Sequence, residues 1–316
     1  QPMVFTDLST NGSGTINGWS WNMNGSGNYQ NPTNNTSQNP LYTFDNCGIS
    51  NVQLIVTDDN SCSDSTTIAV EVYCEPVASF SYLPECVGEN TIFTSTSISD
   101  GNITNSYWDM GGTGTYQGGT NSTSKNPIFL YDNCGTYTVT LIIVDDNGCN
   151  DTTLQTVDVY CEPIADFTAT TVCNGDTTDF TNLSSQGPSP SATIASYNWN
   201  MDGTGTYVNG TSSTSQNPSY IYDDCGPHNV TLIVTDNNGC THEIIISVDV
   251  YCNPDANFNA PPLCFDDQPM VFTDLSTNGS GTINGWDWNI NETGNYQNPT
   301  NNTSQNPLYT FDNCGI

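Results

Sequence analysis

The chain has 316 residues and a formal net charge of −32, because 33 acidic side chains are opposed by one basic side chain, Lys125. Such a polyanion has nothing with which to neutralise phosphate groups, which excludes nucleic-acid binding and docking on anionic lipid through basic residues. The hydrophobic content of 34%, with 10% aromatic residues, is enough for small sandwich cores and excludes a disordered chain. No run approaches the roughly 18 apolar residues of a membrane-spanning segment, so membrane insertion is not expected.

The first residues are typical of the middle of a domain. Gln1 is not an initiator methionine, and the segment that follows it has no signal-peptide pattern. We therefore expect the sequence to be a piece of a longer protein.

The strand pattern is clearest in residues 75–161. Short runs of alternating apolar residues, bounded by Gly, Pro, Asn and Asp, predict β-strands. In chain order these runs are residues 76–82, 91–94, 107–110, 126–131, 136–144 and 152–160. Asn147-Gly148 separates the last two and is typical of a β-hairpin, because both residues tolerate positive φ. With no helical period anywhere, about seven short strands in about 90 residues predict an immunoglobulin-like β-sandwich.

The cysteines recur at a fixed rhythm. Three sets of four share the spacings 15, 12 and 12, and the sets begin 87, 91 and 89 residues apart. The thirteen positions are Cys47, Cys62, Cys74, Cys86, Cys134, Cys149, Cys161, Cys173, Cys225, Cys240, Cys252, Cys264 and Cys314. This regularity indicates a tandem repeat of disulfide-bonded units from an oxidising compartment. Zinc sites favour cysteines two to four residues apart, and this chain has none so close.

A longer period of 267 residues contains the cysteine rhythm. Residues 268–316 repeat residues 1–49 with four changes. We therefore predict an all-β chain of tandem immunoglobulin-like β-sandwiches, arranged head to tail and stapled by disulfides. The predicted domains are residues 1–74, which lack the first strand, 75–161, 162–252, and 253–316, which end before the last two strands. Near-identical repeats are typical of long surface fibres rather than enzymes.

Three motifs recur in the repeats. They are a tryptophan strand followed by a turn, an Asn-Pro-x-Tyr-like segment and a Val-x-Leu-x-Val-x-Asp-like strand. They begin at Trp21, Trp108, Trp199 and Trp288, at Asn39, Asn126, Asn217 and Asn306, and at Val52, Val139 and Val230. In combination they resemble the PKD domain, and the cysteine motifs resemble the PKD repeats of giant adhesin-like surface proteins of the Bacteroidota, which are often glycosylated. The aspartate of the family's Gly-Asp-Gly turn is mostly replaced here by Asn, Ser or Thr, which puts a calcium role of that turn in doubt.

The cysteines flanking the last two strands of each sandwich are equidistant from the hairpin turn between them. This symmetry predicts the disulfides Cys47–Cys74, Cys134–Cys161 and Cys225–Cys252, each worth on the order of 3 kcal/mol. The other cysteines lie at opposite poles of one sandwich, too far apart to bond within it. A staple between neighbouring domains, Cys86–Cys240, is one hypothesis. Cys149–Cys173 and bridges to another chain are the alternatives.

Paired acids lie at strand ends and turns. They are Asp58-Asp59, Asp145-Asp146 and Asp223-Asp224. Carboxylates and carbonyls at domain junctions could hold calcium, the one cofactor that the sequence leaves open. The alternative is that aspartate favours turns for its own hydrogen bonding.

No constellation of catalytic residues is present in the sequence, so we do not expect an enzyme. His228 and His242 occur in one repeat, and no motif places a nucleophile beside them. The tryptophan strands could stack on sugars, but in such sandwiches this tryptophan more often fills the core. Asp-Ser/Thr-Thr triplets resemble Bacteroidota O-glycosylation sites, with Ser65, Thr152 and Thr177 as acceptors.

The composition and the repeats together predict an extracellular structural protein that forms a stalk or filament on the cell surface. Its expected partners are further copies or a continuation of a longer chain, and glycans. Two alternatives stay open: an adhesin array that binds carbohydrate or another surface, and an accessory region of a secreted hydrolase.

Overall fold

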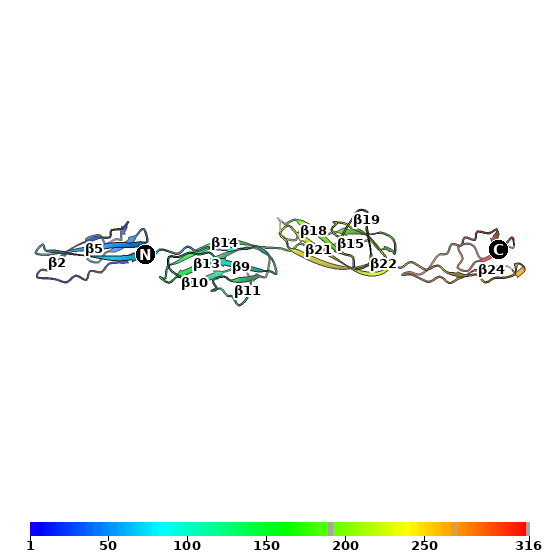
Figure 1. Cartoon of the computed structure of the whole chain (residues 1–316), viewed down its shortest axis with the longest axis horizontal. Coiled ribbons are helices and arrows are strands. Elements are labelled where there is room, and N and C mark those ends of the chain that lie inside the picture. Colours follow the sequence, from blue (N-terminus) through cyan, green and yellow to red (C-terminus); the bar gives the residue numbers. More distant parts are fainter. Residues whose placement is uncertain (189–191, 268, 314–316) are drawn as a thin grey trace. The chain divides into compact units, whose positions relative to one another are not determined.

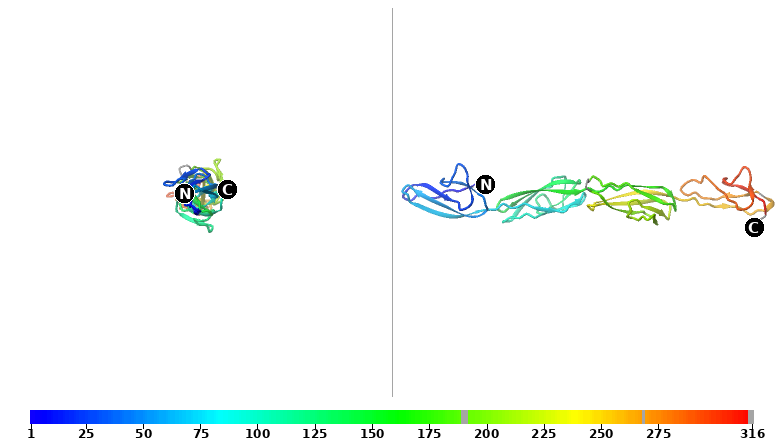
Figure 2. Two further views of the ribbon diagram at one scale, coloured as in Figure 1. Left: turned by 90° about the vertical axis from the view of Figure 1, so that its left-hand side faces the viewer. Right: turned by 90° about the horizontal axis from the view of Figure 1, so that it is seen from above.

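The computed structural model describes residues 1–188, 192–267 and 269–313. Apart from one short 3-10 turn, η1 (Phe265–Asp267), the secondary structure in these ranges is β-strand (Figure 1 and Figure 2). The all-β prediction is therefore confirmed. The chain divides into two compact units, Gln1–Tyr160 and Cys161–Ile316. No helix in the described ranges is long and apolar enough to cross a membrane.

The first unit contains fourteen strands. Residues 1–74 form β1 (Met3–Val4), β2 (Ile16–Asn22), β3 (Gly27–Tyr29), β4 (Leu41–Phe44), β5 (Gly48–Asp58) and β6 (Ser63–Val72). Residues 75–160 form β7 (Phe80–Tyr82), β8 (Glu85–Cys86), β9 (Asn90–Ser95), β10 (Ile103–Asp109), β11 (Gly114–Gln117), β12 (Ile128–Tyr131), β13 (Gly135–Asp145) and β14 (Asn150–Tyr160).

The second unit repeats this order. Residues 161–252 form β15 (Phe167–Ala169), β16 (Val172–Cys173), β17 (Thr178–Asn182), β18 (Ile194–Asn200), β19 (Gly205–Val208), β20 (Ser219–Tyr222), β21 (Gly226–Asp236) and β22 (Thr241–Tyr251). The remaining strands are β23 (Phe258–Asn259), β24 (Met270–Val271), β25 (Thr273–Asp274), β26 (Gly294–Tyr296) and β27 (Leu308–Phe311).

Residues 75–160 show the complete sandwich. One sheet has the order β10-β13-β14-β8 and the other β11-β12-β9-β7. The hairpin β13–β14 is the longest antiparallel pair, and its register runs from Gly135 opposite Val159 to Val144 opposite Asn150. Because side chains alternate across a strand, Val139, Leu141 and Ile143 all face the core and are fully buried. The third sandwich, residues 161–252, has the same two sheets.

The start of each complete sandwich contributes to both sheets. β7 pairs antiparallel with β9 at the edge of one sheet, and β8 then pairs parallel with β14 at the edge of the other. β15 and β16 do the same in the next repeat. The sequence predicted one continuous first strand and missed β8 and β11, because two- to four-residue strands carry too few positions for a period to be recognised.

The two end segments are each missing part of this plan within the described residues. Residues 1–74 form the three-stranded sheets β2-β5-β6 and β1-β4-β3, which lack the edge strands that β7 and β8 supply elsewhere. Residues 253–313 form the sheet β24-β27-β26 and the pair β23-β25, with no counterpart of β13 and β14. The consequence is that both segments expose part of a sandwich core.

Candidate functional site

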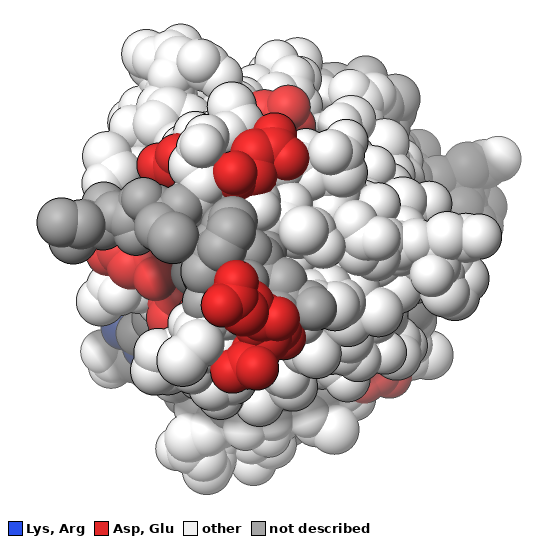
Figure 3. All heavy atoms as spheres, turned by 90° about the vertical axis from the view of Figure 1, so that its right-hand side faces the viewer, with Lys and Arg blue, Asp and Glu red and all other residues white. Residues whose placement is uncertain are grey.

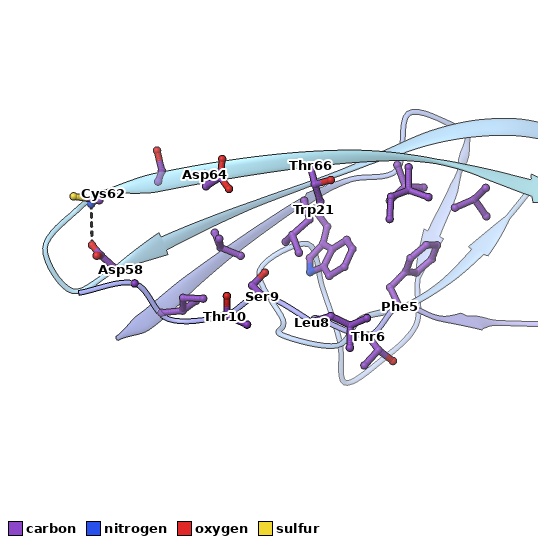
Figure 4. Close-up of a pocket in the computed structure, with 18 residues that line it drawn as sticks. Phe5, Thr6, Leu8, Ser9, Thr10, Trp21, Asp58, Cys62, Asp64 and Thr66 are labelled. Carbon is purple, nitrogen blue, oxygen red and sulfur yellow. Dashed lines mark hydrogen bonds between the residues drawn. The ribbon is translucent and has the colours of Figure 1, made fainter. Parts of the chain in front are cut away.

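The main cavity of the first unit is a groove in residues 1–74, called here the open groove (Figure 4). It has a volume of about 650 Å³. The residues that matter for its chemistry are Phe5, Trp21, Val52, Leu54, Val56 and Val70. Figure 4 shows Phe5 and Trp21 pointing into the space between the segment that carries Leu8 to Thr10 and the strand that carries Asp64 and Thr66. The groove is therefore the inner face of the sandwich, exposed along one side.

Three aromatic rings meet at this position in the other repeats. In residues 75–160, Phe80 lies 5.1 Å from Trp108 and 6.1 Å from Phe93, measured between ring centroids. Phe167, Phe180 and Trp199 form the same triad in the next repeat. The open groove contains two of the three rings, Phe5 and Trp21, at 5.7 Å. The missing ring is the one that β7 and β15 carry.

A hydrogen-bond acceptor stands beside each triad. The backbone N–H of Ala78 donates to Asp151 Oδ2 at 2.8 Å, and that of Ala165 donates to His242 Nδ1 at 3.0 Å. Asp64 occupies the same repeat position and lines the open groove. Among the described residues no donor reaches its carboxylate. The sequence analysis predicted the missing first strand but not this groove, whose signal is the absence of an Ala-x-Phe segment in residues 1–74.

The tryptophans of the recurring strand fill the cores. Trp21, Trp108 and Trp199 are at most 8% exposed, and each indole N–H donates to the carbonyl oxygen of the serine sixteen residues later, at 2.9–3.0 Å. Trp288 makes the same bond to Ser304 at 2.8 Å. A buried ring whose only polar atom is bonded internally offers no face to a sugar, so the core interpretation of these tryptophans is confirmed.

The free sheet edge next to the open groove is organised by a carboxylate clamp. Asp7 accepts hydrogen bonds from the Ser9 backbone N–H at 2.9 Å and the Trp19 indole N–H at 2.7 Å. Asp274 accepts the corresponding bonds from Ser276 and from Trp286. The outer tryptophans thus lie at the rim of the sandwich, as the sequence predicted.

These clamps are expected to open in acid. Hydrogen bonds from Ser276, and further ones from Gln305 and Trp286, lower the pKa of Asp274 to about 2, and the pKa of Asp7 is also lowered because such bonds outweigh its partial burial. A folded-state pKa below the ordinary value of 3.8 means that the clamp stabilises the fold fully above about pH 4. That contribution is lost as the pH falls through about 2. The Trp286 indole N–H resonance, followed by NMR from pH 5 to 1.5, should shift in this window, and the shift should vanish in Asp274→Asn; a midpoint near 3.8 would contradict the clamp.

Two of the predicted disulfides are present, Cys47–Cys74 and Cys225–Cys252. Each joins the start of the long hairpin to its end. Four further cysteines are disulfide-bonded: Cys86, Cys134, Cys161 and Cys240. The pairings Cys134–Cys161 and Cys86–Cys240 stay predictions, which peptide mapping without reduction would test. Cys62, Cys149, Cys173 and Cys264 are thiols, so the alternative Cys149–Cys173 is wrong, and Cys314 lies outside the described residues.

The acidic pairs are engaged in their own turns. Asp58 Oδ1 accepts from the backbone N–H groups of Asn60 and Cys62, both at 2.9 Å, and Figure 4 marks the second of these bonds. Asp145 accepts equivalent bonds from Asn147 and Cys149. Their neighbours Asp59 and Asp146 accept from the backbone N–H groups of Thr15 and Asn102. Only backbone contacts are present at the pair Asp223-Asp224, where the Asp223 N–H donates to Thr204. This bonding supports the turn-stabilising alternative.

Calcium binding at these pairs stays a prediction. Within the described ranges, no three His, Cys, Asp or Glu side chains lie together as a metal site would require. The turn after the tryptophan strand is also bonded internally, because Asp109 Oδ1 accepts from the Gly111 N–H at 2.9 Å. Gly111, Asn24 and Asp202 share positive φ there, a conformation that glycine, asparagine and aspartate adopt most easily.

The predicted glycan acceptors lie on β6, β14 and the turn before β17. Ser65 and Thr152 are exposed on their strands, and Thr177 is half-buried. All three stay predictions. On the face drawn in Figure 3, acidic side chains form separate groups within a largely uncharged surface. Such a surface suits solubility and repulsion between like chains more than tight binding of a charged ligand.

Comparison with known proteins places this fold in a family. A family model described as PKD domain matches residues 75–161 and 160–250, which is more than half of the chain. The pre-pro-metalloprotease PrtV of Vibrio cholerae is 32% identical over 174 residues, which are 55% of this chain and 17% of that protein. The chain therefore spans well under a fifth of the length of this relative.

Two solved domains show the same relationship. The PKD1 domain of the Vibrio cholerae metalloprotease PrtV is 37% identical and covers 27% of this chain and 98% of that chain, with a TM-score of 0.23. The PKD1 domain of Vibrio anguillarum Epp is 30% identical and covers 28% of this chain and 95% of that chain, with a TM-score of 0.24. From the family match over two successive sandwiches, the chain belongs to the PKD domain family.

Proposed function

We propose that the chain is a structural, non-catalytic region of an extracellular protein, whose PKD domains form a stalk or filament. The observation that carries this proposal is the repetition: residues 268–316 repeat residues 1–49 with four changes, at a period of 267 residues. A period that copies both core and surface positions supports a role in which each unit contributes length and strength. The disulfides support an extracellular location, because such bonds persist in oxidising compartments.

The filament proposal is tested by electron microscopy of the purified chain over a range of concentrations. We expect end-to-end assemblies with a regular repeat, because every unit presents the same kind of sandwich to its neighbour. Assembly should be favoured by added salt, which screens repulsion among chains of net charge −32. Dispersed monomers at every concentration and ionic strength would contradict self-association.

A second candidate is an accessory region of a secreted hydrolase. The similarity to part of the pre-pro-metalloprotease PrtV favours it, since that protein combines a PKD region with a catalytic activity in its name. Mass spectrometry of the intact native protein separates the two candidates. Peptides from a protease domain on the same polypeptide would support the accessory role, whereas peptides from further PKD repeats alone would support the stalk.

A further inference from the structure

The open groove has the shape of a missing β-strand. In complete sandwiches an Ala-x-Phe segment fills this place, and both side chains are buried: Ala165 and Phe167 are each 2% exposed. The core positions behind it are sealed as a result, so that Ile143 is fully buried. In residues 1–74 the equivalent Val56 is only half-buried, because nothing among the described residues covers it.

A matching strand is present elsewhere in the chain, in a less favourable place. Residues 253–264 contain Ala256 and Phe258 in the Ala-x-Phe pattern. Phe258 already contacts Phe272 and Trp288, at 6.1 and 5.3 Å between ring centroids. Yet 56% of its surface is exposed, since the described part of residues 253–313 has no long hairpin to cover it.

We propose that residues 253–264 of a second copy of the chain bind in the open groove as an added β-strand. The groove duplicates the surface on which this segment already packs. Phe5 and Trp21 correspond to Phe272 and Trp288 in the 267-residue repeat, and the ring separations are 5.7 and 5.6 Å. The groove then adds what the donor lacks in its own copy, the hairpin β5–β6. Moving the strand therefore keeps its existing contacts and buries the exposed part of Phe258.

The repeats specify the register of this strand. Phe258 and Asn259 pair antiparallel with Asp274 and Thr273 in their own copy, so they would pair with Asp7 and Thr6 in the groove. The parallel pairing of β8 with the end of β14 places Leu263 and Cys264 opposite Val72 and Tyr73.

Polar groups and charge support the same occupant. The backbone N–H of Ala256 would donate to Asp64, as that of Ala78 donates to Asp151. The segment carries one charged side chain, Asp255, so it enters the groove of an acidic chain with little repulsion. Strand addition to a free sheet edge draws its affinity from main-chain bonds and its specificity from alternate side chains in pockets. Here the pocket is the aromatic pair.

This inference rests on the self-association proposed above and names its interface. The first test uses a synthetic peptide of residues 253–264, with Ser at position 264, titrated into the full chain by calorimetry. We expect saturable binding at one site. A Phe258→Ala peptide should bind about tenfold to a hundredfold more weakly, while an Asn259→Ala peptide, altered on the outward face, should bind as the parent does. Absence of binding, or equal binding of all three peptides, would overturn the proposal.

The second test uses receptor variants of the chain. Val56→Lys places a charge in the groove and should abolish peptide binding, whereas Ile55→Lys, on the outer face of the same strand, should not. Circular dichroism shows whether each variant keeps its sheet content. Asp64→Ala is the milder variant and should weaken peptide binding severalfold without affecting the core.

Sedimentation velocity then decides whether a second copy supplies the strand. The chain should associate as its concentration rises, Phe258→Ala should prevent this, and Val271→Ala, a change at an exposed strand residue, should not. A chain that binds peptide but stays monomeric would overturn the second copy as donor. Association or filaments that do not depend on Phe258 would overturn this interface while leaving the proposed function in place. Dimers that depend on Phe258 but form no filaments would support the interface and remove the filament.

Discussion

Replacing Trp108 by alanine is expected to lower the free energy of unfolding of its sandwich by about 3–5 kcal/mol. The ring is 5% exposed and packs against Phe80 and Phe93, and its indole N–H bonds to the Ser124 carbonyl at 2.9 Å. The substitution leaves a cavity at the centre of both sheets and removes the partner of a buried carbonyl. Hydrogen exchange with mass spectrometry on the full chain would report the loss in peptides from β10 and β13.

Tyr107→Ala provides the matched control. This neighbour lies on the same strand with its side chain on the opposite face, and it is 46% exposed. Its replacement is expected to change local stability by less than about 1 kcal/mol. Equal protection losses in the two variants would show that the tryptophan strand is not the centre of the core.

Removing the Cys225–Cys252 bridge with a double serine variant is expected to cost about 3–4 kcal/mol. The bridge closes a loop with a sequence separation of 27, and breaking it frees that loop in the unfolded chain. The bonded pair also holds the start of β21 against the end of β22. Denaturant unfolding, followed by hydrogen exchange in β21 and β22, measures the effect.

Cys173→Ser is the control for this variant. Cys173 is an exposed thiol in the same repeat, so its substitution removes no covalent link and should leave stability unchanged. If the double variant were as stable as this control, the bridge would be dispensable and the sandwich core alone would hold the repeat together.

Local patterns explain why much of the sandwich could be predicted. The alternation in residues 136–144 determines which side chains face inward, and Asn147-Gly148 determines where the chain turns, so the longest hairpin and its disulfides follow from neighbouring residues. The stretch containing β8 has no such pattern. Its partner on β14 lies more than 70 residues away, and a parallel pair of two residues leaves no mark on the sequence.

The open groove illustrates the same limit. Alternation identifies Val52, Leu54 and Val56 as inward-facing, but it cannot say whether a strand from elsewhere covers them. That depends on which edges are paired, and pairing is a property of the folded sheets. The acidic pairs were equally ambiguous, because the same aspartates suit a cation or a turn until their backbone partners are known.

The sequence by itself determined the charge, the repeat, the all-β class, the hairpins and the pairing of Cys47 with Cys74 and of Cys225 with Cys252. These depend on composition, period and local turn chemistry, which are written in consecutive residues. The tertiary structure decided that the tryptophans are core, that Asp58 and Asp145 hold their own turns, and that residues 1–74 present an open groove. Each of these depends on which distant segments come together, and burial and edge pairing exist only once they have.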